Sequence, residues 1–306
     1  MRLTFIKTLE KLAEKDERII LLTADLGFTV FESFRDKFPD RFFNLGVAES
    51  NMIGMAAGLA LSGKIPVTYT FATFTAMRAF EFIRNDICFQ NTNIKMFTLG
   101  GGFGYGLAGF THINFEDLSL LRPLPNLTIL SPSDPLEVEI LTKQALKINS
   151  PVYIRSGKVR EPIIHKKKPK LTIGKGFVYQ KGKKVAIFST GGITHNVIQS
   201  FKLLKAKNIH PTLVIIHTIK PIDKNLIKTI AKNHSHIFSV EEHVVTGGLG
   251  SAVAEVLAES NFKTNFKRLG IDNSFLKTVG NQKFLRNRFG LSPAKIAHTI
   301  INHTLS

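Results

Sequence analysis

The sequence predicts an α/β protein made of two doubly wound domains with mostly parallel sheets. Three observations lead to this prediction. Short apolar runs alternate with segments of helical spacing, as in parallel strands that helices cover on both faces. The 306 residues are enough for about two domains. Residues 162–178, rich in lysine, proline and glycine, interrupt the alternation once, and it then resumes.

The elements of the first half follow from local spacing. Ile6, Leu9, Leu12 and Ala13 recur at helical intervals. Apolar runs of four to six residues predict the strands, because buried parallel strands have no polar face. In chain order we predict a helix around 6–13, a strand at 19–22, a short strand ending before residue 49, a helix at 53–61, a strand at 66–71, a helix at 77–89, strands at 94–99 and 127–130, a helix at 135–148 and a strand at 152–154.

The second half repeats this alternation. Pro293 directly after Ser292 is typical of a helix N-terminus. We predict strands at 185–188, 212–216 and 237–240, and helices at 194–206, 223–231, 249–259 and 293–303. The predicted division is a first domain at 1–163, a linker at 164–178 and a second domain at 179–306.

Charge and cysteine content restrict the class of protein. The formal net charge is +18, but the lysines are scattered except for a dense run at 166–170. We interpret this charge as a solvated surface and expect no nucleic-acid partner, since no zinc-finger, basic-zipper or RNA-binding signature is present. A single cysteine, Cys88, fits a reducing compartment. The charged first 18 residues and the lack of a long apolar run predict a cytoplasmic protein without a membrane segment.

The segment 42–52 (FFNLGVAESNM) carries the main functional signal. It places Glu49 between a short strand and a helix of small apolar residues, with no other acid between Asp40 and Glu81. One interpretation is an acid in the first helical turn that complements the helix dipole. The other is a semi-buried carboxyl group that exchanges a proton with a ligand.

This segment resembles the transketolase family, in which Gly-x-Ala-Glu-x-Asn-Met precedes a small-residue helix, and the resemblance continues over nearly the whole chain. It implies that Glu49 activates thiamin diphosphate by contacting N1′ of the aminopyrimidine ring. The similar segment 70–81 (TFATFTAMRAFE) implies an aromatic wall for that ring, with Phe74 as first choice and Phe71 as second, and implies that Arg78 also binds the cofactor. An extra residue between Phe74 and Arg78 leaves the choice open, and both phenylalanines are also possible core residues.

Two further residues are implied by the same resemblance. Thr111-His112 matches a family turn that brings a histidine to the reacting carbons, so His112 is predicted to contact substrate or move protons. Asp25, in Ala24-Asp25-Leu26 after a strand, is predicted to lie near the cofactor. A loop histidine with a local partner and a helix-capping aspartate are the alternatives.

The family's sugar-phosphate contacts are only partly present. Arg2, Thr29 and Lys158 are the candidates for substrate binding, and a lysine at 158 replaces an arginine and its bidentate fork. The glycine run 100–104, Ala108 and Phe110 replace a histidine, an aspartate and a proline of the family. These differences leave the substrate open, including whether it is phosphorylated.

The sequence has no Gly-Asp-Gly, the motif with which the family anchors the diphosphate through Mg²⁺ or Ca²⁺. The resemblance therefore implies an N-terminal partner chain that carries this motif and holds the metal, in an α2β2 assembly. The second half resembles the family's C-terminal domain through residues 218–223 (TIKPID), 240–243 (VEEH) and 247–251 (GGLGS). Those glycines have the wrong spacing for a dinucleotide site, and we expect them to pack closely.

We therefore predict the C-terminal (β) subunit of a two-chain, transketolase-like enzyme that transfers a two-carbon ketol unit from a ketose to an aldose. One alternative is the β subunit of a 2-oxo acid dehydrogenase. The others are a non-catalytic assembly subunit and a nucleic-acid-binding protein.

Overall fold

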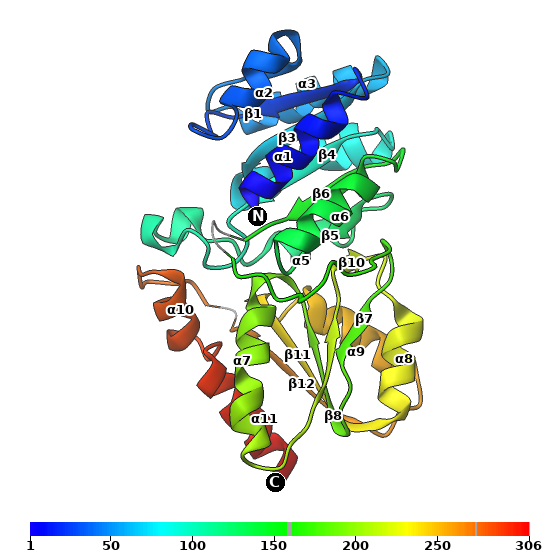
Figure 1. Cartoon of the computed structure of the whole chain (residues 1–306), viewed down its shortest axis with the longest axis vertical. Helices are drawn as coiled ribbons and strands as arrows, with labels where there is room; N and C mark the ends of the chain where they lie inside the picture. Colours follow the sequence, from blue (N-terminus) through cyan, green and yellow to red (C-terminus); the bar gives the residue numbers. More distant parts are fainter. Residues whose placement is uncertain (158–160, 273, 306) are drawn as a thin grey trace.

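The computed structural model describes residues 1–157, 161–272 and 274–305. Two α/β domains lie end to end, with the N-terminus near the place where they meet and the C-terminus at the far end of the second domain (Figure 1). Both domains are doubly wound around mostly parallel sheets, as the sequence predicts.

The first sheet has seven strands in the order β10-β5-β6-β4-β3-β1-β2. All pair in parallel except β10, which pairs antiparallel with β5. Strands β1 and β4 are buried at every position, because helices cover both faces. The strands are β1 (Ile19–Thr23), β2 (Phe42–Asn44), β3 (Ile65–Phe71), β4 (Lys95–Leu99), β5 (Thr128–Leu130), β6 (Val152–Arg155) and β10 (Thr218–Lys220).

The second sheet has five strands in the order β12-β11-β8-β9-β7, and only the edge pair β7–β9 is antiparallel. The carboxyl ends of β8 and β11 point toward the first domain (Figure 1). The strands are β7 (Phe177–Gln180), β8 (Lys184–Ser189), β9 (Thr212–Ile215), β11 (His234–Val244) and β12 (Asn265–Ile271).

The helices have sequence-encoded ends. Asp134 caps α6 by accepting from the Glu137 N–H, and Pro135 occupies the first turn. Asp223 and Asn281 cap α8 and α10 in the same way. The α-helices are α1 (Arg2–Ala13), α2 (Glu32–Lys37), α3 (Glu49–Leu61), α4 (Phe80–Phe82), α5 (Asp117–Leu121), α6 (Pro135–Ala145), α7 (Thr194–Lys205), α8 (Lys224–Lys232), α9 (Leu249–Ala258), α10 (Gln282–Arg288) and α11 (Pro293–Leu305).

The predicted helix at 77–89 is the main departure from regular geometry. Two π-helical segments, η2 (Phe74–Arg78) and η3 (Ile83–Phe89), flank the single α-turn of α4. A π-turn accommodates an additional residue within a helix and is frequent at functional sites. The interval between Phe74 and Arg78, where the family resemblance implies an extra residue, thus lies in η2. Spacing alone did not predict α2, α5, α10 or the edge strands β7, β10 and β12.

The two halves are joined by more than one connection. Strand β10 comes from the second half yet extends the first sheet, and the Ser131 N–H donates to the His217 carbonyl (2.8 Å). The segment between β6 and β7 runs beside α6, where the Ile164 and His165 N–H groups donate to Asp134 Oδ2. These hydrogen bonds and the pairing of β10 with β5 therefore fix the arrangement of the chain at the junction.

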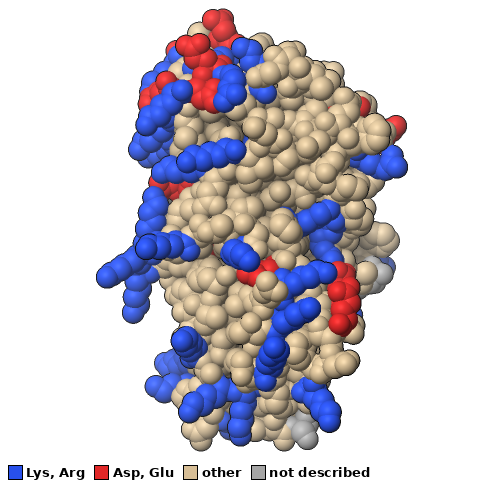
Figure 2. All heavy atoms as spheres, turned by 90° about the vertical axis from the view of Figure 1, so that its right-hand side faces the viewer, with Lys and Arg blue, Asp and Glu red and all other residues tan. Residues whose placement is uncertain are grey.

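Surface charge differs along the molecule. Acidic and basic side chains mix at the first domain's end, whereas Lys and Arg predominate at the second domain's end (Figure 2). In sequence terms, residues 1–163 have 18 Lys and Arg against 17 Asp and Glu, and residues 179–306 have 18 against 6. Within the described residues, no helix combines the length and apolar character that crossing a membrane requires.

Candidate functional site

The candidate site lies at the carboxyl edge of the first sheet. In the order β2-β1-β3-β4, β2 lies on one side of β1, and β3 and β4 lie on the other side. The order in which strands are added across the sheet therefore reverses between β1 and β3. Ligands of open α/β sheets bind beside such reversal points, outside the carboxyl ends of the strands. Asp25 follows β1, Glu49 follows β2 and Phe71 ends β3. The topology therefore brings residues distant in sequence to one edge.

Glu49 is the first residue of α3, and only 3% of its surface is exposed. Its Oε2 accepts a hydrogen bond from Arg78 Nη1 (3.0 Å). Among the described residues, no hydrogen bond reaches its other oxygen, Oε1. A buried carboxyl group of this kind still has acceptor capacity for a ligand.

An aromatic cluster adjoins this carboxyl group. The Phe74 ring lies 5.5 Å from the Phe71 ring and 5.2 Å from the His112 imidazole, all between centroids. Phe71 and His112 are also 5.2 Å apart. The Arg78 guanidinium lies 4.0 Å from the Phe74 centroid. The structure thus joins Glu49, Arg78, Phe74, Phe71 and His112 in one continuous set of contacts.

His112 lies in the short 3₁₀-helix η5 (Phe110–His112), which follows η4 (Gly106–Ala108). It is partly exposed, and its Nδ1 lies 3.0 Å from Thr111 Oγ1. That neighbour orients the ring, and Nε2 has no hydrogen bond among the described residues. The imidazole is therefore placed to contact a ligand beside the two phenylalanines.

Tyr105 is a member of this wall that the sequence did not predict. Its ring packs edge-on against Phe71 (4.6 Å) and lies over Gly100, where a Cβ would come within 2.6 Å of it. Burial raises the pKa of the Tyr105 phenol, and the nearby Arg2 charge opposes this shift. The buried Nε of Arg2 has no hydrogen-bond partner within the described residues. The sequence feature that could have indicated Tyr105 is its position directly after the glycine run 100–104.

Asp25 and Thr29 make local hydrogen bonds and, among the described residues, do not share in the contacts of this cluster. Asp25 is exposed at φ 50°, and its N–H donates to Asn44 Oδ1 (2.9 Å). Thr29 is exposed at φ 62°, and its N–H donates to Glu32 Oε1 (2.6 Å). Lys158 lies outside the described residues. In the described part of the chain, neither Asp25 nor Thr29 forms a hydrogen bond or ion pair with Glu49 or Arg78.

The glycine run connects the site to the domain junction. Glu242 accepts from the Phe103 N–H (2.7 Å) and from Arg286 Nε (2.8 Å) and Nη2 (2.6 Å). A Cβ on Gly102 would come within 2.5 Å of Glu242. The segment carrying the run is therefore fixed against the second domain.

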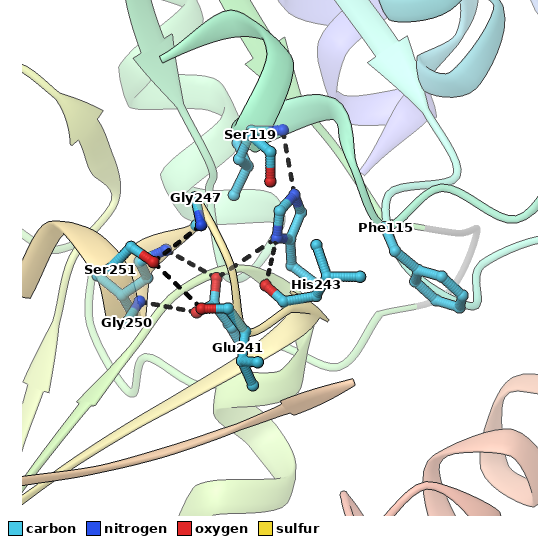
Figure 3. A network of polar contacts seen from close by, with 12 residues as sticks. Phe115, Ser119, Glu241, His243, Gly247, Gly250 and Ser251 are labelled. Carbon is cyan, nitrogen blue, oxygen red and sulfur yellow. Dashed lines mark hydrogen bonds and ion pairs between the residues drawn. The ribbon is translucent and has the colours of Figure 1, made fainter. Parts of the chain in front are cut away.

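Glu241 and His243 complete the junction (Figure 3). Glu241 accepts from the N–H groups at the start of α9, those of Leu249 and Gly250 (both 2.7 Å). His243 Nε2 accepts from the Leu118 N–H (3.2 Å), and its Nδ1 lies 2.8 Å from the Val244 carbonyl. A Cβ on Gly248 would come within 2.0 Å of Glu241, so the predicted close packing of the glycines 247–250 is confirmed.

The residues at the site fit part of a thiamin diphosphate site. The unpaired oxygen of Glu49 and the aromatic wall suit a flat heteroaromatic ring with a basic nitrogen. Among the described residues, no group of three His, Cys, Asp or Glu side chains could hold a metal ion.

Comparisons with family models and with known proteins identify one and the same family. Residues 1–160 match the model of the transketolase pyrimidine-binding domain, and residues 174–296 match that of the transketolase C-terminal domain. A putative transketolase C-terminal section of Methanocaldococcus jannaschii is 36% identical over 304 residues, which are 98% of this chain and 95% of that protein.

Two further similarities concern chains of comparable length. One of the subunits of an apulose-4-phosphate transketolase of Actinobacillus succinogenes is 36% identical over 273 residues, 89% of this chain and 86% of that protein. A solved split-gene transketolase, described as an inactive β4 tetramer, has a TM-score of 0.89 at 36% identity and covers 98% of this chain and 97% of its own.

Proposed function

This chain belongs to the transketolase family, and from that premise we propose that it is the C-terminal subunit of a two-chain, thiamin diphosphate-dependent transketolase. It would transfer a two-carbon ketol unit from a ketose to an aldose. The observation that carries the proposal is length: the chain covers 95% of a relative named as a transketolase C-terminal section and 86% of one named as a single transketolase subunit.

Glu49 is the proposed activator of the cofactor. When bound, thiamin diphosphate supplies the carbanion that takes up the two-carbon unit. Glu49 would hold the aminopyrimidine ring through a hydrogen bond from Oε1 and would share a proton at that oxygen. Burial at 3% exposure supports this role because electrostatic contacts of the carboxyl group are stronger in a low-dielectric environment.

The aromatic wall positions the ring and the substrate. Phe74 stacks on the aminopyrimidine, and Phe71, which lies against Phe74 and Tyr105, supports it from behind. His112 contacts the reacting hydroxyl or carbonyl of the sugar and moves a proton at Nε2. Asp25 approaches the cofactor from the end of β1.

The end of the substrate distant from the reacting carbons is proposed to be bound by Arg2, Thr29 and Lys158. The buried Nε of Arg2 has no hydrogen-bond partner among the described residues, which supports a role in anion binding. A sugar or a sugar phosphate is the proposed substrate class.

The partner is an N-terminal chain that carries Gly-Asp-Gly and holds Mg²⁺ or Ca²⁺, in an α2β2 assembly in the cytoplasm. A solved relative made of β chains alone is described as an inactive β4 tetramer, which supports the need for a second kind of chain. The domain division at 1–163, 164–178 and 179–306 belongs to the same proposal, as does the expectation of no nucleic-acid partner.

Reconstitution tests the proposal. The chain is mixed with the product of a candidate gene that encodes Gly-Asp-Gly, and ketol transfer is measured with thiamin diphosphate, Mg²⁺ and sugar phosphates. Activity is expected from the mixture and not from either chain alone. Full activity of this chain by itself would refute the two-chain proposal, whereas activity on 2-oxo acids with a lipoyl carrier would favour the dehydrogenase alternative.

A further inference from the structure

Arg78 has contacts that the proposed chemistry does not yet explain. Its guanidinium touches both Glu49 and the Phe74 ring, the two groups assigned to the aminopyrimidine. We infer that Arg78 is a positioning residue, which holds the Glu49 carboxyl group by one oxygen and supports the Phe74 ring, and does not itself bind the cofactor. This inference rests on the proposed function of Glu49.

The first turn of α3 fixes Arg78 at two points. Glu49 accepts from its side chain (3.0 Å), and the next residue, Ser50, donates from Oγ to its backbone carbonyl (2.9 Å). Ala79, directly after it, is fully buried. The backbone of Arg78 therefore has little freedom, and its side chain starts from a fixed position beside Glu49.

The π-turn explains why the guanidinium lies over the ring. Phe74 and Arg78 are the first and last residues of η2, whose wider turn accommodates the extra residue between them. A guanidinium is planar and stacks on an aromatic face at close range, which an ammonium group does less well. The 4.0 Å distance to the Phe74 centroid is in this range.

Electrostatics require a partner for Glu49. An ionised carboxyl group that is almost fully buried is costly unless a charge or several hydrogen bonds compensate it. Within the described residues, Arg78 is the one cation paired with Glu49, and it reaches only Oε2. The pair thus keeps Oε1 oriented and available for the ring nitrogen.

The test uses the reconstituted two-chain complex with thiamin diphosphate. Arg78→Ala removes a half-exposed side chain and leaves no core cavity, but it unpairs the Glu49 charge, so folding of the variant is verified first by urea unfolding. Two quantities are measured: the affinity for thiamin diphosphate by calorimetry, and the exchange rate of its C2 proton by NMR. Exchange is expected to slow by about ten- to hundredfold, as for loss of a hydrogen bond to a charged group.

Two variants distinguish orientation from general damage. Millimolar guanidinium should restore part of the exchange rate in Arg78→Ala, and Arg78→Lys should retain an intermediate rate because it keeps the charge without the planar fork. Arg84→Ala is the matched control, since Arg84 is exposed and donates to its neighbour Asn85 (2.8 Å). Its exchange rate should equal that of the wild type.

The outcomes separate this inference from the proposed function. Exchange within twofold of wild type in Arg78→Ala, while Glu49→Gln abolishes it, would overturn the positioning role alone. Tighter cofactor binding in Arg78→Ala would show that the guanidinium occupies the ring's place, and would also overturn it. If the wild-type complex binds no thiamin diphosphate, the proposed function fails and the inference fails with it.

Discussion

Two buried glutamates in this molecule, Glu49 and Glu242, have arginine partners but very different surroundings. Glu49 is 3% exposed and accepts one hydrogen bond, from the half-exposed Arg78. Glu242 is 5% exposed and accepts four, from a backbone N–H, an amide and two nitrogens of the buried Arg286. Within the described residues, Glu49 Oε1 accepts no hydrogen bond, whereas both oxygens of Glu242 accept hydrogen bonds.

The difference separates Glu49, which is proposed to act in catalysis, from Glu242, which is expected to stabilise the domain junction. A buried polar network with every group satisfied gives rigidity and a defined geometry. A buried acid with spare acceptor capacity is a candidate ligand-binding group, which is the role proposed for Glu49. We expect changes at Glu49 to act on turnover, and changes at Glu242 to act on stability.

Glu49→Gln is expected to have the largest effect. Glutamine keeps the size and a hydrogen-bond acceptor but cannot share a proton with N1′, so ketol transfer by the two-chain complex should fall by about 10²–10⁴-fold or more. Its unfolding free energy should stay close to that of the wild type. Steady-state rates and urea unfolding measure the two. Near-normal turnover would remove Glu49 from its role.

Glu242→Gln is expected to have the converse effect. Loss of this charge leaves Arg286 uncompensated at the junction, and breaking a buried ion pair costs about 3–5 kcal/mol. The matched control is Glu255→Gln, whose carboxyl group is 57% exposed and pairs with Arg122. That change should cost less than about 1 kcal/mol. Equal urea midpoints for the two variants would contradict the assignment of Glu242 to the junction.

Sequence reasoning reached much of the site because parallel sheets collect the ends of their strands at one edge. Glu49, Phe71 and Phe74 each follow or end a strand, so their proximity could be expected, although their roles stay predictions. The π-turn could not be predicted, because the spacing of 77–89 is compatible with an α-helix. The contact between Glu242 and Phe103 joins residues 139 positions apart and depends on how the two domains meet.

The smallest effects concern pH and two neighbours at the junction. Burial lowers the pKa of His243 to about 4, against the attraction of Asp117, and raises the pKa of Glu241 to about 7, against the hydrogen bonds from the start of α9. Both shifts favour the neutral form in the folded state. Neutral His243 also accepts from the Leu118 N–H, which a protonated ring could not do.

The two shifts have opposite consequences for stability. The contribution of His243 is complete above its unfolded pKa of about 6.5 and is lost as pH falls toward about 4. That of Glu241 is complete below about 4.3 and is lost as pH rises through about 7. His243→Gln should therefore flatten the decline in unfolding free energy on the acid side, and Glu241→Gln the decline toward neutral pH, by up to about 3 kcal/mol each.

Urea unfolding of the wild type and both variants between pH 4 and pH 8 measures these slopes. Differences between curves isolate the two groups, because all other titrating groups are common to the three proteins. Parallel curves would show that neither group is held neutral by burial. A pH-dependent change in the cofactor affinity of Glu241→Gln, without a change in stability, would instead show that the junction is coupled to the candidate site through Glu242 and the glycine run. That result would contradict the separation between residues that act on turnover and residues that act on stability.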